Sequence, residues 1–519
     1  MKKCNGSPEE IKGPGASNVN RRGFLKSGIG VGALAATGLA LNLNPAPAEA
    51  GTRKLPARWD ERVDVVIVGS GFAGLAAAAE AAGAGANVVI LEKMPVYGGN
   101  SIISGGGYCS WDSKLHLRQK LNLGEDSWER HKADTLKGGD YFNMPELVEV
   151  MVKGAPDGLN LLIDNGAAIR ETLPRIGGHS AYRSYQADEG VGRGFTEPLR
   201  KLAEKRGAKI RLNTRVTWIW RKDAEGPVLG VEVTAGKKKS NIRINRGLII
   251  AAGGFSRDVK MRMSFNPTLV PEYNCTNQPG ATGEMIRYAQ SVGADALHLE
   301  FIQLYPCAEP EKGIIDSFAI HPYSGTGFGL FYVNKQGKRF VNELERRDVV
   351  SNTQIASGQK PTYAILNGKV FDKLAVGKEE IEKGIARGRF VKADTIGELA
   401  QKLGIPEAGL EETVALHNSY VKEGKDPEFN KPMTKNMTPL LEGPFYAIAQ
   451  WPAIHHCMGG IRIDARAQVI DIWGNPIPRM FAAGEVCGGV QGTNRLGGNA
   501  IPNCIVFGRI AGINAAGEK

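Results

Sequence analysis

The C-terminal half of the chain holds arginines and histidines of the kinds that bind an anion. His455 opens the sequence HHCMGG, Arg495 lies within NRLGGNA, and Arg347 is the second arginine of ERRD. A guanidinium set among glycines can bind a carboxylate through two parallel N–H bonds, so Arg495 is a candidate ligand for a carboxylate. Arg347 could act on the same anion, or it could only pair with an acid across a domain interface. For His455 the alternative is a structural histidine, paired with His456 at the edge of a core.

A nucleotide-binding element is predicted from residue 63 onward. Residues 63–68 (VDVVIV) form a continuous apolar and β-branched run, as a buried parallel strand should. The sequence GSGFAG follows directly, and an alanine-rich helix is predicted over 75–82. Gly69 permits a tight turn, Gly71 lets a pyrophosphate meet backbone N–H groups, and Gly74 lets the helix and strand pack closely.

A second strand over 87–92 ends on Glu92, where a carboxylate would accept a hydrogen bond from a ribose 2′-OH. This element alone would serve NAD as well as FAD. Further glycine-rich segments favour FAD, because distant segments that close around one cofactor are typical of FAD enzymes. They are residues 97–107, 247–254, expected to be another strand and turn, and 480–486, expected to return to the same sheet. The predicted cofactor contacts are Gly69, Gly71, Ala73, Gly74, Glu92, Lys93, Gly99, Asn100, Ser101, Gly106, Gly107, Ala252, Gly253, Gly254, Gly484, Glu485, Asn499 and Ala500.

Length and composition set the frame for these motifs. A chain of 519 residues exceeds what one core usually organises, so two domains plus appendages are expected. The net charge of +11 comes without a Lys/Arg run interleaved with aromatics, which argues against nucleic acid as a partner. A basic surface would suit anionic substrates or an acidic redox partner. The seven cysteines form no CxxC or CxxCH pair, so we expect no metal site and no c-type haem on this chain.

The N-terminus is typical of an export signal. Arg21 and Arg22 stand before Phe-Leu-Lys and a mildly apolar stretch over 28–43, and AEA at 48–50 has the A-x-A cleavage pattern. This arrangement resembles a twin-arginine signal, which exports folded proteins, and it predicts a periplasmic enzyme. The alternatives are a membrane anchor or a basic amphipathic helix. The stretch is too short and too weakly apolar for a stable span, and no later segment is long enough for one.

Taken together, the motifs resemble the FAD subunits of soluble periplasmic fumarate reductases of the flavocytochrome c type. The relatives of these subunits include urocanate and methacrylate reductases. The segments that carry the resemblance are HHCMGG, AGEVCGGV at 483–490, NRLGGNA, and VNKQGKRFVNE at 333–343 ahead of RRD. The resemblance covers residues 63–516.

The resemblance implies an α/β fold with a split, Rossmann-like FAD-binding domain and an inserted α+β capping domain. We expect a signal peptide over 1–50, the first part of the FAD-binding domain over 51–298, the capping domain over 299–456, and the second part of the FAD-binding domain over 457–519. Substrate would lie between the cap and the flavin.

The resemblance also implies a reaction. Non-covalent, reduced FAD would pass hydride from N5 to the β-carbon of an α,β-unsaturated acid. His455 and Arg495 would hold the substrate carboxylate as charge builds on it, and Arg347 would protonate the α-carbon. Because the FAD-binding domain follows the signal almost directly, electrons are expected from a separate protein, a multihaem cytochrome c. The enzyme would then be a terminal reductase of anaerobic respiration.

The chain departs from the fumarate reductases where they hold the second carboxylate of fumarate. Their His-Pro corresponds to Tyr305-Pro306, their Thr-Glu falls near Pro322-Tyr323, and an arginine that relays protons falls near Thr326. A buried second carboxylate without partners would be strongly disfavoured. Fumarate is therefore a less suitable substrate than a monocarboxylic 2-enoate such as methacrylate, acrylate, urocanate or cinnamate, whose tail Tyr305 would meet.

The same departures leave the proton route to Arg347 open, with His321, Tyr323, Glu343 or water as candidates. Two other functions were weighed. A flavin dehydrogenase such as a 3-ketosteroid Δ1-dehydrogenase shares the two-domain, glycine-rich pattern, but a steroid has no carboxylate for a cationic clamp. A non-catalytic flavin carrier, or a redox-sensing partner of another protein, would bind FAD without turning over a small molecule.

Overall fold

The computed structural model describes residues 53–518. The predicted export signal over 1–50 lies outside these residues. The larger of two main sheets has the order β16-β17-β8-β1-β2-β5, and β7 joins β6 to β8. Its strands are β1 (Glu61–Val68), β2 (Val88–Leu91), β5 (Lys209–Arg211), β6 (Thr214–Arg221), β7 (Val228–Ala235), β8 (Lys238–Ile250), β16 (Gln468–Ile470) and β17 (Pro476–Ala482).

The centre of this sheet is parallel, as the buried β-branched runs predict. β1 pairs in parallel with β2 and with β8, and β17 pairs in parallel with β8. The register places Met480 beside Leu248 and Ala482 beside Ile250. The prediction that residues 480–486 return to the first sheet is therefore confirmed, because β17 ends at the same edge as β1 and β8.

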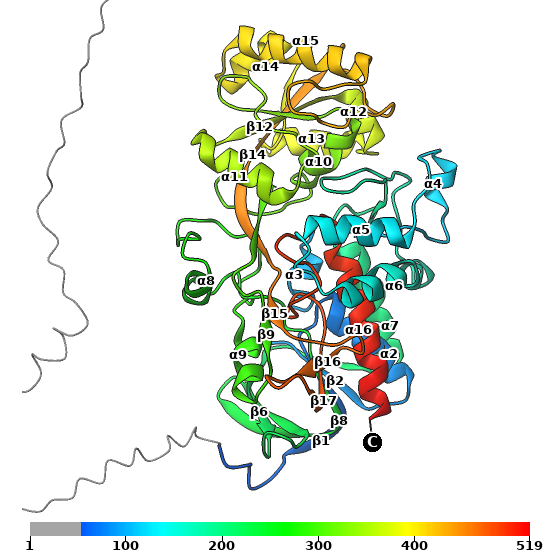
Figure 1. The fold of residues 1–519 in the computed structure, drawn as a ribbon, viewed down its shortest axis with the longest axis vertical. Helices are drawn as coiled ribbons and strands as arrows, with labels where there is room; N and C mark the ends of the chain where they lie inside the picture. Colours follow the sequence, from blue (N-terminus) through cyan, green and yellow to red (C-terminus); the bar gives the residue numbers. More distant parts are fainter. Residues whose placement is uncertain (1–52, 519) are drawn as a thin grey trace, which may run out of the picture. The chain divides into compact units, whose positions relative to one another are not determined.

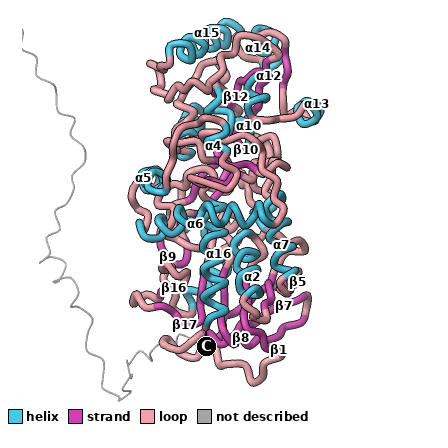
Figure 2. Tube along the Cα trace, turned by 90° about the vertical axis from the view of Figure 1, so that its right-hand side faces the viewer, coloured by secondary structure: helices cyan, strands magenta, loops and turns pink. Residues whose placement is uncertain are grey.

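Three helices lie along one face of this sheet (Figures 1 and 2). They are α2 (Phe72–Gly83), α7 (Arg193–Lys205) and α16 (Ala500–Gly517). Small residues let α16 approach α2 closely: a Cβ at Gly508 would lie 2.5 Å from the Ala73 carbonyl oxygen, and one at Gly512 would lie 2.3 Å from that of Ala77. The C-terminal helix is thus part of the nucleotide-binding fold.

Further helices and short strands surround this layer. They are α3 (Gly99–Ile102), β3 (Gly107–Cys109), α4 (Leu117–Lys120), α5 (Trp128–Gly138), α6 (Pro145–Asp164), β4 (Ser184–Gln186), α8 (Val259–Phe265), α9 (Glu284–Ser291), β9 (Ala296–Leu297) and β15 (Gly460–Ile461). β3 pairs with β4, and β9 pairs with β15, each antiparallel. Within residues 53–518, no helix has both the length and the apolar character needed to cross a membrane.

A second, antiparallel sheet forms from the middle of the chain. Its strands are β10 (Ile302–Ala308), β11 (Phe331–Val333), β12 (Thr362–Asn367), β13 (Val391–Ala393) and β14 (Phe445–Cys457), in the order β10-β14-β12-β11 with β13 also on β14. The helices packed with it are α10 (Ile320–Ser324), η1 (Gly325–Phe328), α11 (Arg347–Ser357), α12 (Gly368–Lys373), α13 (Lys378–Ala386), α14 (Ile396–Leu403) and α15 (Glu407–Glu423).

The long strand β14 leads from the second sheet back toward the first, and α14 and α15 lie at the opposite end (Figure 1). The predicted α/β fold with an inserted α+β part is confirmed, because the second sheet and its helices lie in the sequence between β8 and β16 of the first sheet. The exact domain boundaries stay predictions, because residues 55–519 form one compact unit. For brevity, we call residues 302–457 the cap and the rest of the described chain the body.

Candidate active site

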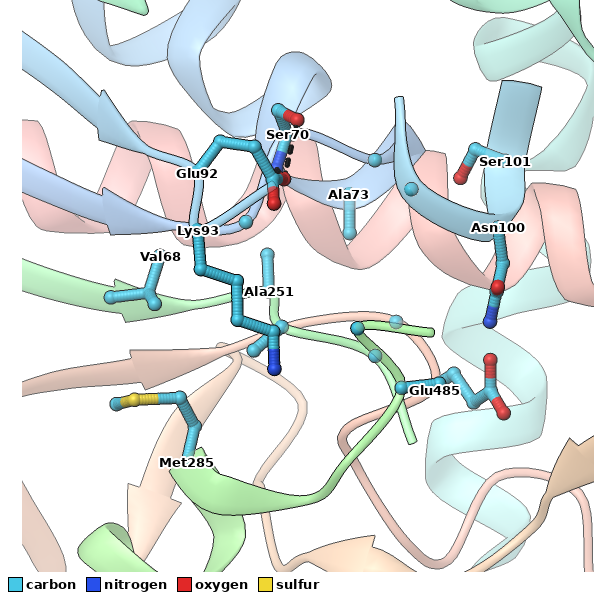
Figure 3. Close-up of a pocket in the computed structure, with 18 of the residues that line it drawn as sticks. Val68, Ser70, Ala73, Glu92, Lys93, Asn100, Ser101, Ala251, Met285 and Glu485 are labelled. Atoms are coloured by element: carbon cyan, nitrogen blue, oxygen red, sulfur yellow. Dashed lines mark hydrogen bonds between the residues drawn. The ribbon is translucent and has the colours of Figure 1, made fainter. Parts of the chain in front are cut away.

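A cavity opens beyond the carboxyl ends of β1, β2 and β8 (Figure 3). Its floor is the glycine loop that precedes α2. Gly69 has φ +103°, and a Cβ there would lie 2.4 Å from the Ala251 carbonyl oxygen, so only glycine fits. The carboxylate of Glu92 accepts hydrogen bonds from the Ser70 N–H at 3.1 Å and the Ser70 hydroxyl at 2.6 Å. This is the cradle that the sequence predicts for a dinucleotide.

A second cavity adjoins the first. The two share five lining residues, namely Phe72, Asn100, Ser101, Glu485 and Cys504. A long groove that starts at a phosphate-binding loop and continues past several glycine-rich segments suits a flavin dinucleotide. The residues present therefore fit FAD.

Most of the predicted cofactor residues line these cavities. The first contains Gly69, Gly71, Ala73, Glu92, Lys93, Gly99, Asn100, Ser101, Ala252, Gly253, Gly484 and Glu485, and the second contains Gly106, Gly107 and Ala500. The other three predicted residues lie behind the walls. A Cβ at Gly74 would lie 2.0 Å from the Gly69 carbonyl oxygen, and one at Gly254 would lie 2.6 Å from a Glu485 carboxylate oxygen. The Asn499 side chain is bonded to His131 and Thr135 instead.

The longest lining segment that was not predicted lies before and at the start of α9. Residues 276–285 (TNQPGATGEM) contact both cavities through several of their members. The Gln278 backbone N–H donates to the Asn100 side chain at 2.9 Å, and Lys93 Nζ donates to Thr282 Oγ1 at 2.8 Å. The Pro-Gly and Thr-Gly pairs in this segment are a turn signal from which the sequence could have indicated a cofactor loop.

The second cavity brings together the four predicted catalytic residues. Arg347 begins α11, Arg495 lies in the loop before α16, His455 lies near the end of β14, and Tyr305 lies on β10. All four line its wall, and the Tyr305 and His455 rings lie 5.1 Å apart. Residues separated by up to 190 positions in the sequence therefore meet at one place.

The two arginines carry positive charge that no neighbouring acid neutralises. Arg347 Nη1 donates to Gln303 Oε1 at 3.3 Å, and Arg495 Nη1 donates to the Leu496 carbonyl at 3.2 Å. Within residues 53–518, neither forms an ion pair, and the Nε of each is buried without a hydrogen-bond partner. Burial, and then the charge of Arg347, lower the pKa of Arg495 to about 9. Such a wall favours an anion.

The alternative role for Arg347, a bridge to an acid, belongs to its neighbour. The guanidinium of Arg346 pairs with Asp140, from the body, and with Asp348. Arg347 instead lines the cavity, where its guanidinium contacts aromatic rings. This division of roles separates a structural arginine from one that faces the ligand cavity.

Both histidines of HHCMGG are buried beside the arginines. Burial, followed by the charges of Arg495 and Arg347, holds the pKa of His455 and of His456 well below the usual range, so both are neutral. His455 Nδ1 is hydrogen-bonded to Thr276 Oγ1 at 2.8 Å, whereas His456 Nδ1 lies 3.7 Å from Glu485. A neutral imidazole held by one nitrogen can still bind a carboxylate through the other.

Tyr305 and Tyr323 enclose the Arg347 guanidinium from two sides. Its central carbon lies 4.8 Å from the Tyr305 ring centroid and 4.5 Å from that of Tyr323. The Tyr305 hydroxyl donates to the Ala319 carbonyl at 2.9 Å, so its ring face, not its hydroxyl, is turned to the site. Aromatic faces hold a guanidinium without neutralising it.

The three side chains considered for a proton route have different positions. Tyr323 contacts Arg347 and lines the cavity. His321 is hydrogen-bonded to Glu380 at 2.9 Å, and Glu343 is buried with Arg339 and Lys431. Tyr323 is therefore the one of the three that touches the predicted proton donor.

Gln303 is a further residue that was not predicted. Its amide nitrogen donates to Asn494 Oδ1 at 2.6 Å and to the Arg495 carbonyl at 2.7 Å, while its oxygen accepts from Arg347. Its signal was available, because Gln303 and Tyr305 are two apart on one strand and so share a face.

The rest of the cavity wall is apolar or neutral. It contains Ile103, Ile176, Ile315, Ile320, Ser184, Gln186 and Ser324. Among the described lining residues, the cationic groups are Arg347 and Arg495, and the acidic one is Glu485. Burial raises the pKa of Glu485 to about 7, so it adds little negative charge under neutral conditions. The wall therefore has positive charge at Arg347 and Arg495, and its other side chains are uncharged or nearly so.

Comparison with known proteins agrees with this site. A family model described as FAD binding domain matches residues 64–501. The chain belongs to this FAD-binding family. It is 38% identical over 460 residues to the urocanate reductase of Eggerthella lenta, covering 88% of this chain and 74% of the relative. It is 35% identical over 511 residues to the acrylate reductase flavoprotein subunit of Shewanella woodyi, covering 95% of this chain and 97% of that subunit.

Among solved structures, this FAD-binding chain is similar to the open conformation of a flavocytochrome c3 fumarate reductase. The TM-score is 0.68 at 34% identity, with 89% of this chain and 79% of the other covered. The predicted resemblance to the fumarate and urocanate reductase family is confirmed, and with it the assignment to the FAD-dependent oxidoreductases.

Proposed function

We propose that the protein reduces the C=C bond of an α,β-unsaturated monocarboxylate, a 2-enoate. The observation that carries this proposal is the pair of buried arginines without an acid partner, set in the wall of the cavity that continues the dinucleotide cradle. A 3-ketosteroid or a carrier function would leave this charge without a ligand. The relatives named urocanate reductase and acrylate reductase support the same class of substrate.

The side chains divide the work as follows. FAD, when bound and reduced, would supply the hydride for the β-carbon. Arg495 and His455 bind the substrate carboxylate and stabilise the negative charge that builds toward it as the hydride arrives. Arg347 delivers a proton to the α-carbon, which completes the saturated acid. The two tyrosine rings restrict where the Arg347 guanidinium can lie, and such placement is essential for proton transfer.

The uncharged wall supports a substrate with one carboxylate. Ile176, Ile315 and Ile320 offer no partner to a second carboxylate, whose burial would be costly. Methacrylate, acrylate and cinnamate suit this wall, and urocanate suits it when its imidazole ring is neutral. Fumarate suits it less well. Tyr305 lines the same cavity, where its ring would meet the tail of the substrate.

Cellular context is part of the proposal. The twin-arginine motif at Arg21 and Arg22 supports export of the folded, FAD-loaded enzyme to the periplasm. Non-covalent binding of FAD is part of the same proposal and rests on the family resemblance. A multihaem cytochrome c would deliver electrons, which makes the enzyme a terminal reductase of anaerobic respiration. Turnover with such a diffusing donor should weaken as salt screens the encounter. Turnover that is unchanged by a salt titration would argue against this donor.

The proposal is tested by Arg347→Gln, compared with Arg387→Gln as a control. Arg387 belongs to the cap and contacts Phe318, and neither of these two residues lines the cavity. We expect the first variant to keep FAD and to lose reoxidation of its reduced flavin by enoates, while the second behaves as the wild type. Equal reoxidation in Arg347→Gln and the wild type would refute the role of Arg347 as proton donor.

A further inference from the structure

The loop between α5 and α6 contacts both segments that carry the site arginines. Its backbone is left-handed at Asp140 (φ +52°) and Tyr141 (φ +61°). Such backbone conformations are unfavourable for residues other than glycine, so the surrounding contacts must stabilise them. Here the Tyr141 N–H donates to the Leu136 carbonyl at 2.9 Å and the Phe142 N–H to the Gly139 carbonyl at 3.1 Å.

Asp140 uses its two carboxylate oxygens on two different segments. Oδ1 accepts from Nη1 of Arg346, and Oδ2 accepts from the Thr493 hydroxyl. Arg346 immediately precedes Arg347, and Thr493 lies two residues before Arg495. One side chain of the body thus binds the turn that leads into α11 of the cap and the loop that leads into α16.

The two attachments are not equally dependent on Asp140. The Arg495 loop has other supports, since the Thr493 N–H donates to the Gly139 carbonyl at 3.1 Å and Gln303 binds the Asn494 side chain. Arg346 has Asp348 as its remaining acid partner, and Asp348 belongs to the same helix as Arg347. The cap turn keeps one backbone bond to the body, from the Gly178 N–H to the Leu344 carbonyl at 2.9 Å, so loss of Asp140 would free the Arg346 side chain without detaching the turn.

We propose that Asp140 is a positioning residue that fixes Arg347 relative to Arg495 through Arg346 and Thr493. This inference rests on the proposed function, because it concerns how far the proton donor of that reaction, Arg347, lies from the carboxylate ligand, Arg495. Asp140 lines neither cavity, so its effect is exerted through placement of the other two side chains. A proton donor that is displaced slows the chemical step more than it weakens binding by Arg495 and His455.

The test uses the FAD-loaded protein, reduced anaerobically, with the enoate that reoxidises the wild type fastest. For Asp140→Asn, Arg346→Gln and the double variant, the limiting rate of flavin reoxidation and the apparent dissociation constant are measured separately. Glu412→Gln is the matched control, because Glu412 forms an exposed ion pair with Lys338 far along the cap. Flavin content and thermal unfolding are recorded for each variant.

We expect Asp140→Asn and Arg346→Gln each to lower the limiting rate about tenfold while the dissociation constant changes by less than about threefold. The double variant should be no slower than either single one, because both act through one contact. Asp140→Glu should recover part of the rate, and Glu412→Gln should match the wild type.

Different outcomes overturn different claims. A wild-type rate in Asp140→Asn, fully additive losses in the double variant, or a loss that only follows flavin content would overturn the positioning role. A wild type that no enoate reoxidises would overturn the proposed function, and this inference with it.

Discussion

At the scale of single residues, the central feature is a pair of buried arginines that contribute to ligand binding and not to the stability of the fold. Arg347 and Arg495 are 5% and 3% exposed and share a wall with the neutral His455. Burial of a charge without a partner destabilises the folded protein, and such charges are commonly found at ligand sites, where the bound ligand becomes the partner. The ligand-free protein should therefore be less stable than its core would allow.

We predict that Arg495→Met stabilises the ligand-free protein by about 1–2 kcal/mol, because it removes a buried charge without an acid partner. A saturated carboxylate at 100 times its dissociation constant should stabilise the wild type by about 2.7 kcal/mol and leave the variant unchanged. Urea unfolding with and without propionate measures both effects.

The control is Arg262→Met. Arg262 is also buried, but three carbonyl groups accept from its guanidinium, at 3.0 Å for Leu269, 3.0 Å for Ser256 and 2.9 Å for Val270. This variant should be destabilised, because it leaves those carbonyls without donors. If Arg495→Met loses as much stability as Arg262→Met, Arg495 is a structural residue.

The sequence allowed the four predicted catalytic side chains to be named, and the structure brings them to one wall. Gln303 was not predicted, and Tyr323 was named only as one of several candidates for the proton route. That Tyr323, and neither His321 nor Glu343, contacts Arg347 depends on how α10 folds. Such placement depends on tertiary packing and not on local residue types.

At the scale of secondary structure elements, the glycine loop before α2 is the feature that makes a cofactor site. The predicted strand, loop, helix and strand are all present, although α2 begins at Phe72 rather than residue 75. Gly71 caps this helix in an extended conformation, so the loop passes into the helix without a linker. The prediction began the helix after the glycine motif because glycine has a low helix propensity.

We predict that Gly69→Ala abolishes FAD binding. A Cβ at this position would lie 2.4 Å from the Ala251 carbonyl oxygen, so the loop must move away from β8. Gly85→Ala is the matched control, since Gly85 is also left-handed (φ +81°) but has nothing within 4 Å of the added carbon. The ratio of flavin to protein after purification should fall to near zero in the first variant and stay near one in the second. Full flavin content in Gly69→Ala would contradict this account of the loop.

At the scale of the whole described chain, several histidines are buried in neutral form. Burial holds the pKa of His179 and of His417 at about 3, and it holds the pKa of His131, His455 and His456 well below the usual 6.5. Below pH 6.5 the unfolded chain binds protons at these positions and the folded chain does not. The free energy of unfolding should therefore fall as the pH falls through 6.5, by about 1.4 kcal/mol per pH unit for each histidine.

One group opposes this trend. The pKa of Glu485 is raised from 4.5 to about 7, so between these values the folded chain holds a proton that the unfolded chain lacks. Its contribution to stability therefore grows as the pH falls from 7 to 4.5, and it offsets about one histidine. We predict a lower urea midpoint for the FAD-free protein at pH 5.5 than at pH 7.0. An equal or higher midpoint at pH 5.5 would show that these histidines are not buried as neutral groups.

Sequence reasoning also anticipated that distant segments close around one cofactor, and β17 and α16 do return to β1, β8 and α2. It did not anticipate the β6–β7 hairpin attached to β8, or the loop at Asp140 that contacts both arginine segments. Both depend on contacts between segments that have no distinctive composition of their own.

The most direct test of the central claim is an anaerobic one. The purified, FAD-loaded protein is reduced with dithionite, and flavin reoxidation is followed after addition of acrylate, methacrylate, cinnamate, urocanate or fumarate, with propionate as the saturated control. The account predicts fast reoxidation by at least one monocarboxylic enoate, slower reoxidation by fumarate and none by propionate. Flavin that stays reduced with every unsaturated acid would contradict it.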